Sequence, residues 1–192
     1  MAPEDVFDAI LALLSATSYK RRFAEDLEDV FPHIPFPADH AVLMRAVAVG
    51  REIRAVETFA RPAEARFRPA AFCRLASEPA AGDVVGAVTW RAGEIILCPD
   101  GRGRITGIPE AVWGFAVSGY RVLPRWIDGR RGLPADLGLV RELRDVAARI
   151  AELIHRFDEA DLVLDATLAH SLTRAELGSP AALAEAEPDG DD

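Results

Sequence analysis

The sequence predicts an α+β fold with a helical N-terminal part, a small, mostly antiparallel sheet in the middle and a helical C-terminal part. Near both ends, apolar residues recur at spacings of three and four, which is typical of amphipathic helices. In the middle, short apolar runs alternate with turn residues, which is typical of strands. Half of the 192 residues are apolar and 28% are charged, so the chain can bury a core.

The N-terminal part is predicted to hold three helices. Asp39 is suited to cap the third, and three prolines before it favour an extended segment. Helices are expected over residues 4–14, from Thr17 or Ser18 to about Val30, and from Asp39 to about Val56.

The middle of the chain predicts a basic loop followed by a short meander. Residues 59–71 contain Pro62 and Pro69, which oppose regular structure. The meander covers residues 83–107, and a later helix is expected to end near Gly129. Strands are expected over 84–90, 94–98 and 112–117, and the helix over 120–127.

The clearest helix is predicted over residues 137–157, where Leu139, Leu143, Val146 and Ile150 recur at helical spacing. This stripe is expected to be core, with a seam for a partner helix as the alternative. Helical character should continue through residues 162–168. Beyond Leu177 periodicity is lost, so we expect one domain over 1–174 and a disordered acidic tail over 175–192.

The net charge of -9 hides a basic block in the middle of the chain. Residues 41–131 carry 14 basic and nine acidic residues, whereas residues 175–192 carry six acidic residues and no basic one. Such asymmetry favours an anion-binding face. The alternative is a set of solvated arginines scattered over the surface.

Several classes of site lack a signature in this sequence. The two cysteines, Cys73 and Cys98, are unclustered, so we expect buried thiols rather than a disulfide or a zinc site. The single lysine, Lys20, follows a tyrosine and therefore cannot belong to a phosphate-binding P-loop. Gly101, Gly103 and Gly107 are one residue out of register for a dinucleotide-binding loop, and a turn is the better interpretation.

No catalytic residue or metal ligand is predicted either. The four histidines have no metal-binding spacing, and the serines lack a nucleophile elbow. No apolar run approaches the roughly 20 residues that would span a bilayer. The acidic N-terminus does not resemble a secretory signal. We therefore expect a cytoplasmic protein without a membrane partner.

One segment resembles a family signature. The pattern Ile-Pro, Val-Trp, Gly-Tyr, Val-Leu and Trp, each at a fixed spacing, occurs in residues 108–130, and an earlier match covers residues 15–27 and 31–35. Both resemble the C-terminal specificity domain of Type ISP restriction-modification enzymes. The chain departs from the family pattern at Thr17-Ser18, where Ser-Pro is usual, and at Ser118, where glycine is usual.

The resemblance implies a DNA target-recognition module that binds duplex DNA for an adenine-specific methyltransferase. The methyltransferase motifs Phe-X-Gly-X-Gly and Asp/Asn-Pro-Pro-Tyr do not occur in this sequence. We therefore expect no catalysis by this chain and no cofactor, and a methyltransferase-bearing polypeptide acting in trans. The alternative is a protein-interaction module without DNA contact, or a relic fragment of an adenine-specific methyltransferase.

The resemblance also gives the basic block a purpose, because arginine contacts both phosphates and guanine edges. Three aromatic residues of the signature, Trp113, Tyr120 and Trp126, are expected to be core anchors rather than base-stacking groups, with Gly119 breaking the preceding strand. The candidate DNA contacts are Arg61, Arg66, Arg68, Arg91, Arg102, Arg104, Arg121, Arg125, Arg130 and Arg131.

The partner is expected to dock on the N-terminal helices. Phe7, Tyr19 and Phe23 are the candidate anchors, since a stable contact usually needs a buried aromatic centre. For each of them, a place in the domain's own core is the alternative.

Overall fold

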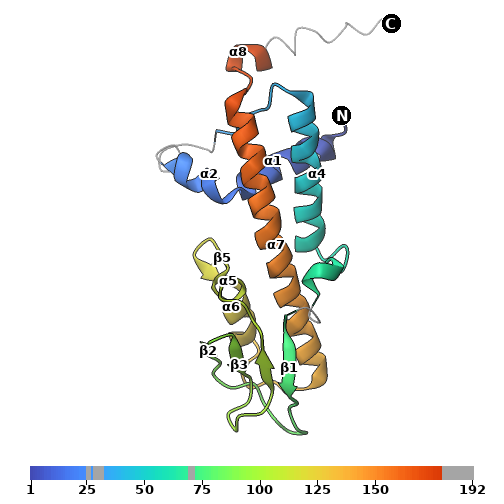
Figure 1. The fold of residues 1–192 in the computed structure, drawn as a ribbon, viewed down its shortest axis with the longest axis vertical. Helices are drawn as coiled ribbons and strands as arrows, with labels where there is room; N and C mark the ends of the chain where they lie inside the picture. Colours follow the sequence, from blue (N-terminus) through green and yellow to red (C-terminus); the bar gives the residue numbers. More distant parts are fainter. Residues whose placement is uncertain (25–26, 28–32, 69–71, 179–192) are drawn as a thin grey trace, which may run out of the picture. The chain divides into compact units, whose positions relative to one another are not determined.

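A computed structural model describes residues 1–24, 27, 33–68 and 72–178. The element order confirms the predicted α+β class, with strands in the middle and helices at both ends (Figure 1). The chain forms two compact units. The helical unit comprises residues 1–52 and 157–192, and the strand-bearing unit comprises residues 53–156.

The helical unit is built from α1 (Pro3–Ser15), α2 (Thr17–Arg22), most of α4 (His40–Glu57), the C-terminal part of α7 (Leu137–Ala169) and α8 (Arg174–Leu177). Pro3 suits the first helical position of α1, and the Asp5 carboxylate accepts the Ala2 N–H at 2.9 Å. The α1 residues Ala9, Ala12 and Leu13 are buried.

The strand-bearing unit contains a four-stranded antiparallel sheet in the order β1-β4-β3-β2. The strands are β1 (Arg74–Ser77), β2 (Trp90–Arg91), β3 (Glu94–Ile96) and β4 (Arg104–Thr106), and a 3₁₀ turn, η1 (Ala65–Phe67), precedes them. Ile95 and Ile105 are fully buried and belong to one apolar cluster with Leu123 and with Leu143 of α7.

A small helix-hairpin-helix follows the sheet. It consists of α5 (Glu110–Gly114), β5 (Ala116–Val117), β6 (Tyr120–Arg121) and α6 (Val122–Asp128). The Val122 N–H donates to the Phe115 carbonyl at 2.9 Å, which ties the base of the hairpin together. Val112 and Trp113 of α5 and Leu123 and Ile127 of α6 are buried.

Several predictions are confirmed. The third helix is α4, the stripe beginning at Leu137 is α7, and α6 ends at a cap on Gly129. Cys73 and Cys98 are buried free thiols. The predicted continuation of the second helix to Val30, and most of the predicted acidic tail, lie outside the described residues, and the boundary at residue 174 stays a prediction.

The predicted strand over 112–117 is correct at residues 116–117, which form β5, and wrong at residues 112–114. Residues 110–114 form α5, because Pro109 sets a helical entry and its carbonyl accepts the N–H groups of Val112 and Trp113. Two consecutive buried residues fit one face of a helix, whereas a strand would place them on opposite faces.

The predicted strand over 84–90 and the predicted helix start at Tyr120 also need correction. Only Trp90 and Arg91 pair as β2, while Val84 makes an isolated bridge to Pro134. Tyr120 lies in β6, and α6 begins two residues later, at Val122. Among the described residues, no helix has the length and apolar content that crossing a membrane requires.

Candidate nucleic-acid interface

The outer face of the four-stranded sheet carries three arginines. Register pairs Arg74 of β1 with Thr106, Thr106 with Glu94, and Glu94 with Arg91. Residues paired in register point to the same face, so these four side chains form one row across the sheet. Arg104 lies two residues before Thr106 on β4 and therefore faces the same way.

The opposite face of the sheet is core. Ile95 and Ile105, which alternate with the arginine-bearing positions, are fully buried, and Leu75 and Trp90 pack against the same cluster. The outer arginines, in contrast, are exposed. Strand alternation thus places a mostly cationic surface on one side of the unit, and we call this surface the outer sheet face. It includes Arg74, which is not among the ten arginines predicted from the sequence.

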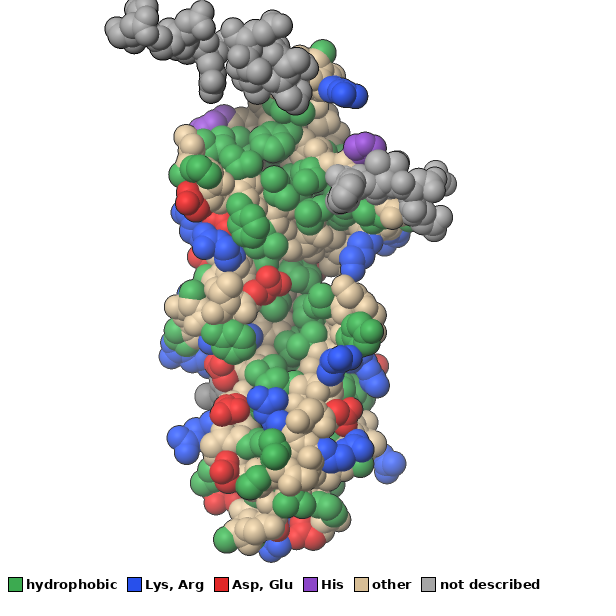
Figure 2. Space-filling view, turned by 180° about the vertical axis from the view of Figure 1, so that it is seen from behind, with side chains coloured by type: hydrophobic (Ala, Val, Ile, Leu, Met, Phe, Trp, Pro, Cys, Tyr) green, Lys and Arg blue, Asp and Glu red, His purple; other side chains and the backbone are tan. Residues whose placement is uncertain are grey.

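Charge also separates the two units. The strand-bearing unit holds 16 basic and 12 acidic residues, and the helical unit holds six basic and 19 acidic residues. On the side drawn in Figure 2, basic and acidic side chains are interspersed over the strand-bearing unit. Both signs of charge therefore occur on this surface, and the distances between side chains show which arginines have a carboxylate partner.

Among the ten candidate arginines, Arg61 has the most deeply buried carboxylate partner. Its guanidinium donates to the Glu152 carboxylate of α7 at 2.5 Å, and Glu152 is fully buried. Burial alone disfavours the charged form of Glu152, but hydrogen bonds from Arg61 and from the Glu64 N–H, together with the charge of Arg156, hold its pKa below the usual value.

Arg102 is held by two carboxylates. It lies 2.8 Å from Asp83 and 2.6 Å from Asp100. A hydrogen bond from the Ala80 N–H, followed by the bond and charge of Arg102, lowers the pKa of Asp83. Arg102 therefore links the carboxylates of two loops of the protein, one that contains Asp83 and one that contains Asp100.

Four further candidates have one carboxylate partner each, in ion pairs that are either longer or more exposed to solvent. Arg66 contacts Glu64 at 3.1 Å, and Arg104 contacts Glu94 at 3.5 Å. The last two are Arg130, 3.9 Å from Glu142 and stacked on Trp126 at 3.5 Å from the ring centroid, and Arg131, 2.8 Å from Asp128.

The remaining four candidates, within the part of the chain that the structure describes, have no acidic side chain at ion-pair distance. Arg68 donates to the Ala63 carbonyl, and Arg91 lies on the outer sheet face. Arg121 lies on β6, within the β5–β6 hairpin, and Arg125 lies on α6, which follows the hairpin. These exposed cations keep their charge available for an external anion.

The hairpin of β5 and β6 corrects one expectation about the signature. Tyr120 is 62% exposed and so is not a core anchor, although Trp113 is buried and Trp126 is half-buried. The Arg125 guanidinium lies over the Tyr120 ring, 4.5 Å from its centroid. Helical spacing from Tyr120 to Leu123 predicts burial only if Tyr120 is helical, and it is not.

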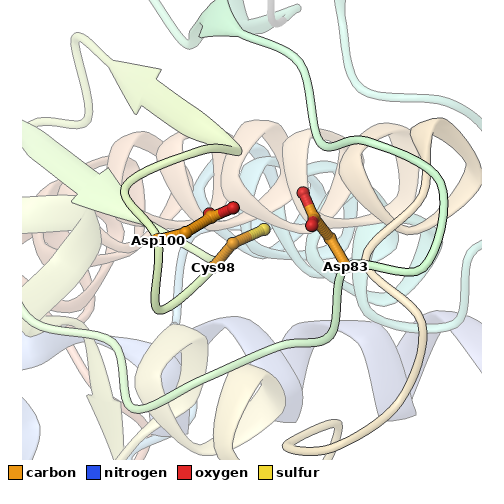
Figure 3. Close-up of side chains that lie close together, drawn as sticks. All are labelled: Asp83, Cys98 and Asp100. Carbon is orange, nitrogen blue, oxygen red and sulfur yellow. The ribbon is translucent and has the colours of Figure 1, made fainter.

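Asp83, Cys98 and Asp100 lie close enough to offer a metal three ligand atoms (Figure 3). The cation already present is the Arg102 guanidinium, which bridges both carboxylates. Burial, followed by the charges of Asp83 and Asp100, raises the pKa of the Cys98 thiol to about 11, so the thiol stays protonated at neutral pH, whereas metals bind thiolates. This donor set fits the internal arginine better than a metal.

The aromatic anchors proposed for partner docking behave differently from one another. Tyr19 is buried, its hydroxyl donates to the His33 carbonyl at 2.7 Å, and its ring lies 4.7 Å from that of Phe23. Phe7 is 56% exposed. Tyr19 therefore serves the core of the helical unit, and Phe7 is the accessible aromatic residue of the three.

A family model agrees with the sequence signature and covers most of the chain. The family model described as the Type ISP C-terminal specificity domain matches residues 1–155. The chain belongs to this family. The specificity domain thus accounts for most of the sequence, including α1, the sheet and the helix-hairpin-helix.

Solved structures share the fold of this specificity domain. A chain of the DrdV–DNA complex is similar with a TM-score of 0.58 and 21% identity over 86% of the present chain. A nuclease-deletion mutant of the Type ISP enzyme LlaGI with a DNA substrate mimic gives 0.54 and 17% over 86%. The ATP-dependent Type ISP enzyme LlaBIII bound to DNA gives 0.55 and 16% over 91%.

These relatives are much longer proteins. The specificity domain described here corresponds to 18%, 14% and 12% of the DrdV, LlaGI and LlaBIII chains respectively. No curated protein matches the sequence.

Proposed function

We propose that this specificity domain recognises duplex DNA through the strand-bearing unit, and that the outer sheet face is its principal contact. The observation that carries the proposal is the row formed by Arg74, Thr106, Glu94 and Arg91, with Arg104 beside it. This face is cationic in a chain whose net charge is -9. A polyanion is the binding partner that such a face selects.

The spacing of the outer sheet face suits a DNA groove. Arg74 and Arg91 are separated by three strand intervals, or about 14 Å, close to the ~12 Å width of the major groove of B-DNA. In this arrangement the two arginines contact phosphates on either side of the groove. Thr106 and Arg104 then face the base edges, where hydroxyl and guanidinium groups read sequence.

The ten arginines predicted from the sequence take different roles in this proposal. Arg91 and Arg104 act on the outer sheet face, and Arg68, Arg121 and Arg125 are available as additional phosphate contacts. Arg61 and Arg102 serve mainly to hold the unit together, since their carboxylate partners are close. The other three, Arg66, Arg130 and Arg131, have partly exposed carboxylate partners and contribute only if DNA displaces them.

We propose further that the domain has no catalytic activity of its own and serves a methyltransferase-bearing polypeptide. Support comes from the missing cofactor and adenine-pocket motifs, and from the small part of the solved DNA-bound chains that the domain covers. Calorimetry with S-adenosylmethionine should show no binding by the chain alone. Micromolar binding, or methyl transfer to DNA by the pure protein, would contradict this part of the proposal.

The test of DNA recognition starts from selection, because the target sequence is unknown. The full chain is incubated with a pool of randomised duplexes, bound molecules are amplified, and Kd is then measured for an enriched and a scrambled duplex at several salt concentrations. An enriched consensus, bound with a steep salt dependence, is the expected result. Arg91→Ala and Arg74→Ala should weaken binding.

Arg45→Ala supplies the matched control. Arg45 is exposed and lies on α4 in the helical unit, so its removal changes net charge equally without touching the outer sheet face. If Arg45→Ala and Arg91→Ala lose equal DNA affinity, the loss is explained by the change in net charge and not by the outer sheet face. Failure to enrich any duplex at low salt would favour the alternative, a protein-interaction module.

A further inference from the structure

The β5–β6 hairpin ends in a two-residue turn. Val117 pairs with Tyr120, and the residues between them, Ser118 and Gly119, have φ angles of 50° and 81°. Positive φ at both central positions is the geometry of a type I′ turn, whose twist matches that of the flanking strands. A serine adopts this left-handed conformation only at some cost in free energy. The two-residue turn makes the tip of the hairpin narrow.

The two apolar residues that flank the turn are both exposed. Val117 is 50% exposed and Tyr120 is 62% exposed, whereas Leu123 of the following helix is fully buried. Val117 lines an apolar hollow of about 190 Å³ together with Phe115 and Phe59, and Tyr120 is absent from that lining. The tyrosine ring therefore contributes little to the core or to the hollow.

One cation stacks on the exposed ring and a second lies on the other face of the ribbon. The Arg125 guanidinium lies 4.5 Å from the ring centroid. Arg121 follows Tyr120 in β6, so its side chain leaves the opposite face of the hairpin. In the described ranges, neither arginine forms an ion pair. Stacking of Arg125 on one side of the ring fixes the ring's orientation while much of its surface stays open to solvent.

A narrow ribbon that carries an exposed aromatic ring, with an arginine at each of its two faces, has the chemistry of a nucleic-acid contact. Bases stack on aromatic side chains, and the neighbouring phosphates pair with arginine. A protein partner could cover an exposed tyrosine, but the positive charges of Arg121 and Arg125 on the same helix-hairpin-helix would then need acidic partners. A narrow two-stranded ribbon is also a shape that a DNA groove admits.

We propose that the hairpin tip enters the bound duplex and that Tyr120 stacks on a base, with Arg121 and Arg125 on the adjacent phosphates. The inference rests on the proposed DNA-binding function and adds a second contact, distinct from the outer sheet face. Side chains that wedge between base steps partly unstack them and kink the duplex. In this arrangement the tip distorts the target locally while the sheet reads its groove.

Ring deletion is the first test, made with the full chain and the duplex enriched by selection. Tyr120→Ala should weaken binding about tenfold, which corresponds to ~1.4 kcal/mol and lies within the range for loss of one stacked base. The salt slope should stay unchanged because no charge is removed. Tyr120→Phe keeps the ring and should bind within about twofold of the parent.

A photochemical test locates the contact. The enriched duplex is synthesised with 5-iododeoxyuridine at each thymine in turn and irradiated with the protein. We expect a crosslink at one position, in the peptide that contains Tyr120, which survives in Tyr120→Phe and is lost in Tyr120→Leu. Thermal unfolding of each variant, expected to match the parent, separates loss of contact from loss of fold.

The outcomes separate the two proposals. A parent protein that binds no duplex removes the proposed function and this inference together. A parent that binds DNA, with Tyr120→Ala equally tight and no crosslink to the hairpin, overturns the inference alone. Loss of a protein partner in Tyr120→Ala with unchanged DNA affinity would overturn it as well and would assign the tip to protein docking.

Discussion

Arg61 and Glu152 form a 2.5 Å ion pair across 91 residues of sequence, and the carboxylate is fully buried. Arg61 also donates to the Pro62 carbonyl. The Arg61–Glu152 pair therefore joins the loop that follows α4 to the long helix α7 within the strand-bearing unit. Arg61 is one of the ten arginines that the sequence predicts to contact DNA, and its guanidinium is engaged in this internal ion pair.

The first prediction concerns the stability of this pair. Arg61→Ala leaves a buried carboxylate without its main cationic partner, so the free energy of unfolding should fall by about 3 kcal/mol, the lower end expected for breaking a buried pair. Urea unfolding measures the change. Arg66→Ala is the matched control, because Arg66 is exposed, lies in the same segment and pairs with the partly exposed Glu64; it should cost little. Equal losses would deny Arg61 a special role.

The second prediction concerns acid stability. The pKa of Glu152 is lowered in the folded protein, so its contribution to stability is present above the unfolded pKa of about 4.5 and is lost as the pH falls through the lower, folded value. Glu152→Gln removes this proton linkage. Urea midpoints measured between about pH 6 and 3 should therefore fall less steeply for the variant than for the parent. Parallel curves would contradict the assignment.

The third prediction concerns Gly50, where α4 passes close to α1. An added Cβ would lie 1.7 Å from the Asp8 carbonyl oxygen. Alanine normally favours a helix over glycine by about 1 kcal/mol, but here the backbone clash should dominate and Gly50→Ala should lower the melting temperature. Gly114→Ala is the control, since its Cβ would meet nothing within 4 Å. If Gly50→Ala melts at the same temperature as the parent, α1 can shift away from α4 without loss of stability, and the predicted effect of the clash is wrong.

The sequence predicts the long helices and the order of the helical and strand-bearing parts well, and it predicts the short strands and helices poorly. The stripe that starts at Leu137 and the run behind Asp39 span many turns, so their periodicity is unambiguous and the helices appear as predicted. In contrast, β4 is only three residues long, and a run of that length carries almost no periodic signal.

The local errors have identifiable causes. The apolar run from Val112 to Val117 fits a strand or a buried helix equally well, and the decision depends on the entry at Pro109. The hairpin turn at Ser118-Gly119 lacks the usual Asn-Gly signal. The alternation in Arg104-Ile105-Thr106 is the pattern that would have indicated the outer sheet face.

Pairing of arginines is the property that sequence cannot supply for the candidate site. Arg61 meets Glu152 and Arg102 meets Asp83 only after the chain folds, 91 and 19 residues apart. Composition therefore predicts a basic block correctly and leaves open which of its members are available to DNA. That distinction comes from distances between side chains.

The last prediction tests whether availability decides DNA contact. Arg91 lies on the outer sheet face without a carboxylate at ion-pair distance among the described residues, whereas Arg102 is held by Asp83 and Asp100. Arg91→Ala should reduce the slope of log Kd against log salt by about one unit, as expected when one phosphate contact is lost. Its unfolding should be unchanged.

Arg102→Ala should do the reverse, leaving the salt slope as it is and making the protein easier to unfold, because Asp83 loses its cationic partner. Binding measured by fluorescence anisotropy at four or more salt concentrations, alongside thermal unfolding of both variants, gives each protein a pair of values. If Arg102→Ala reduces the slope as much as Arg91→Ala does, an arginine held by two carboxylates still contacts DNA. Ion pairing would then have to be abandoned as the criterion for assigning this interface.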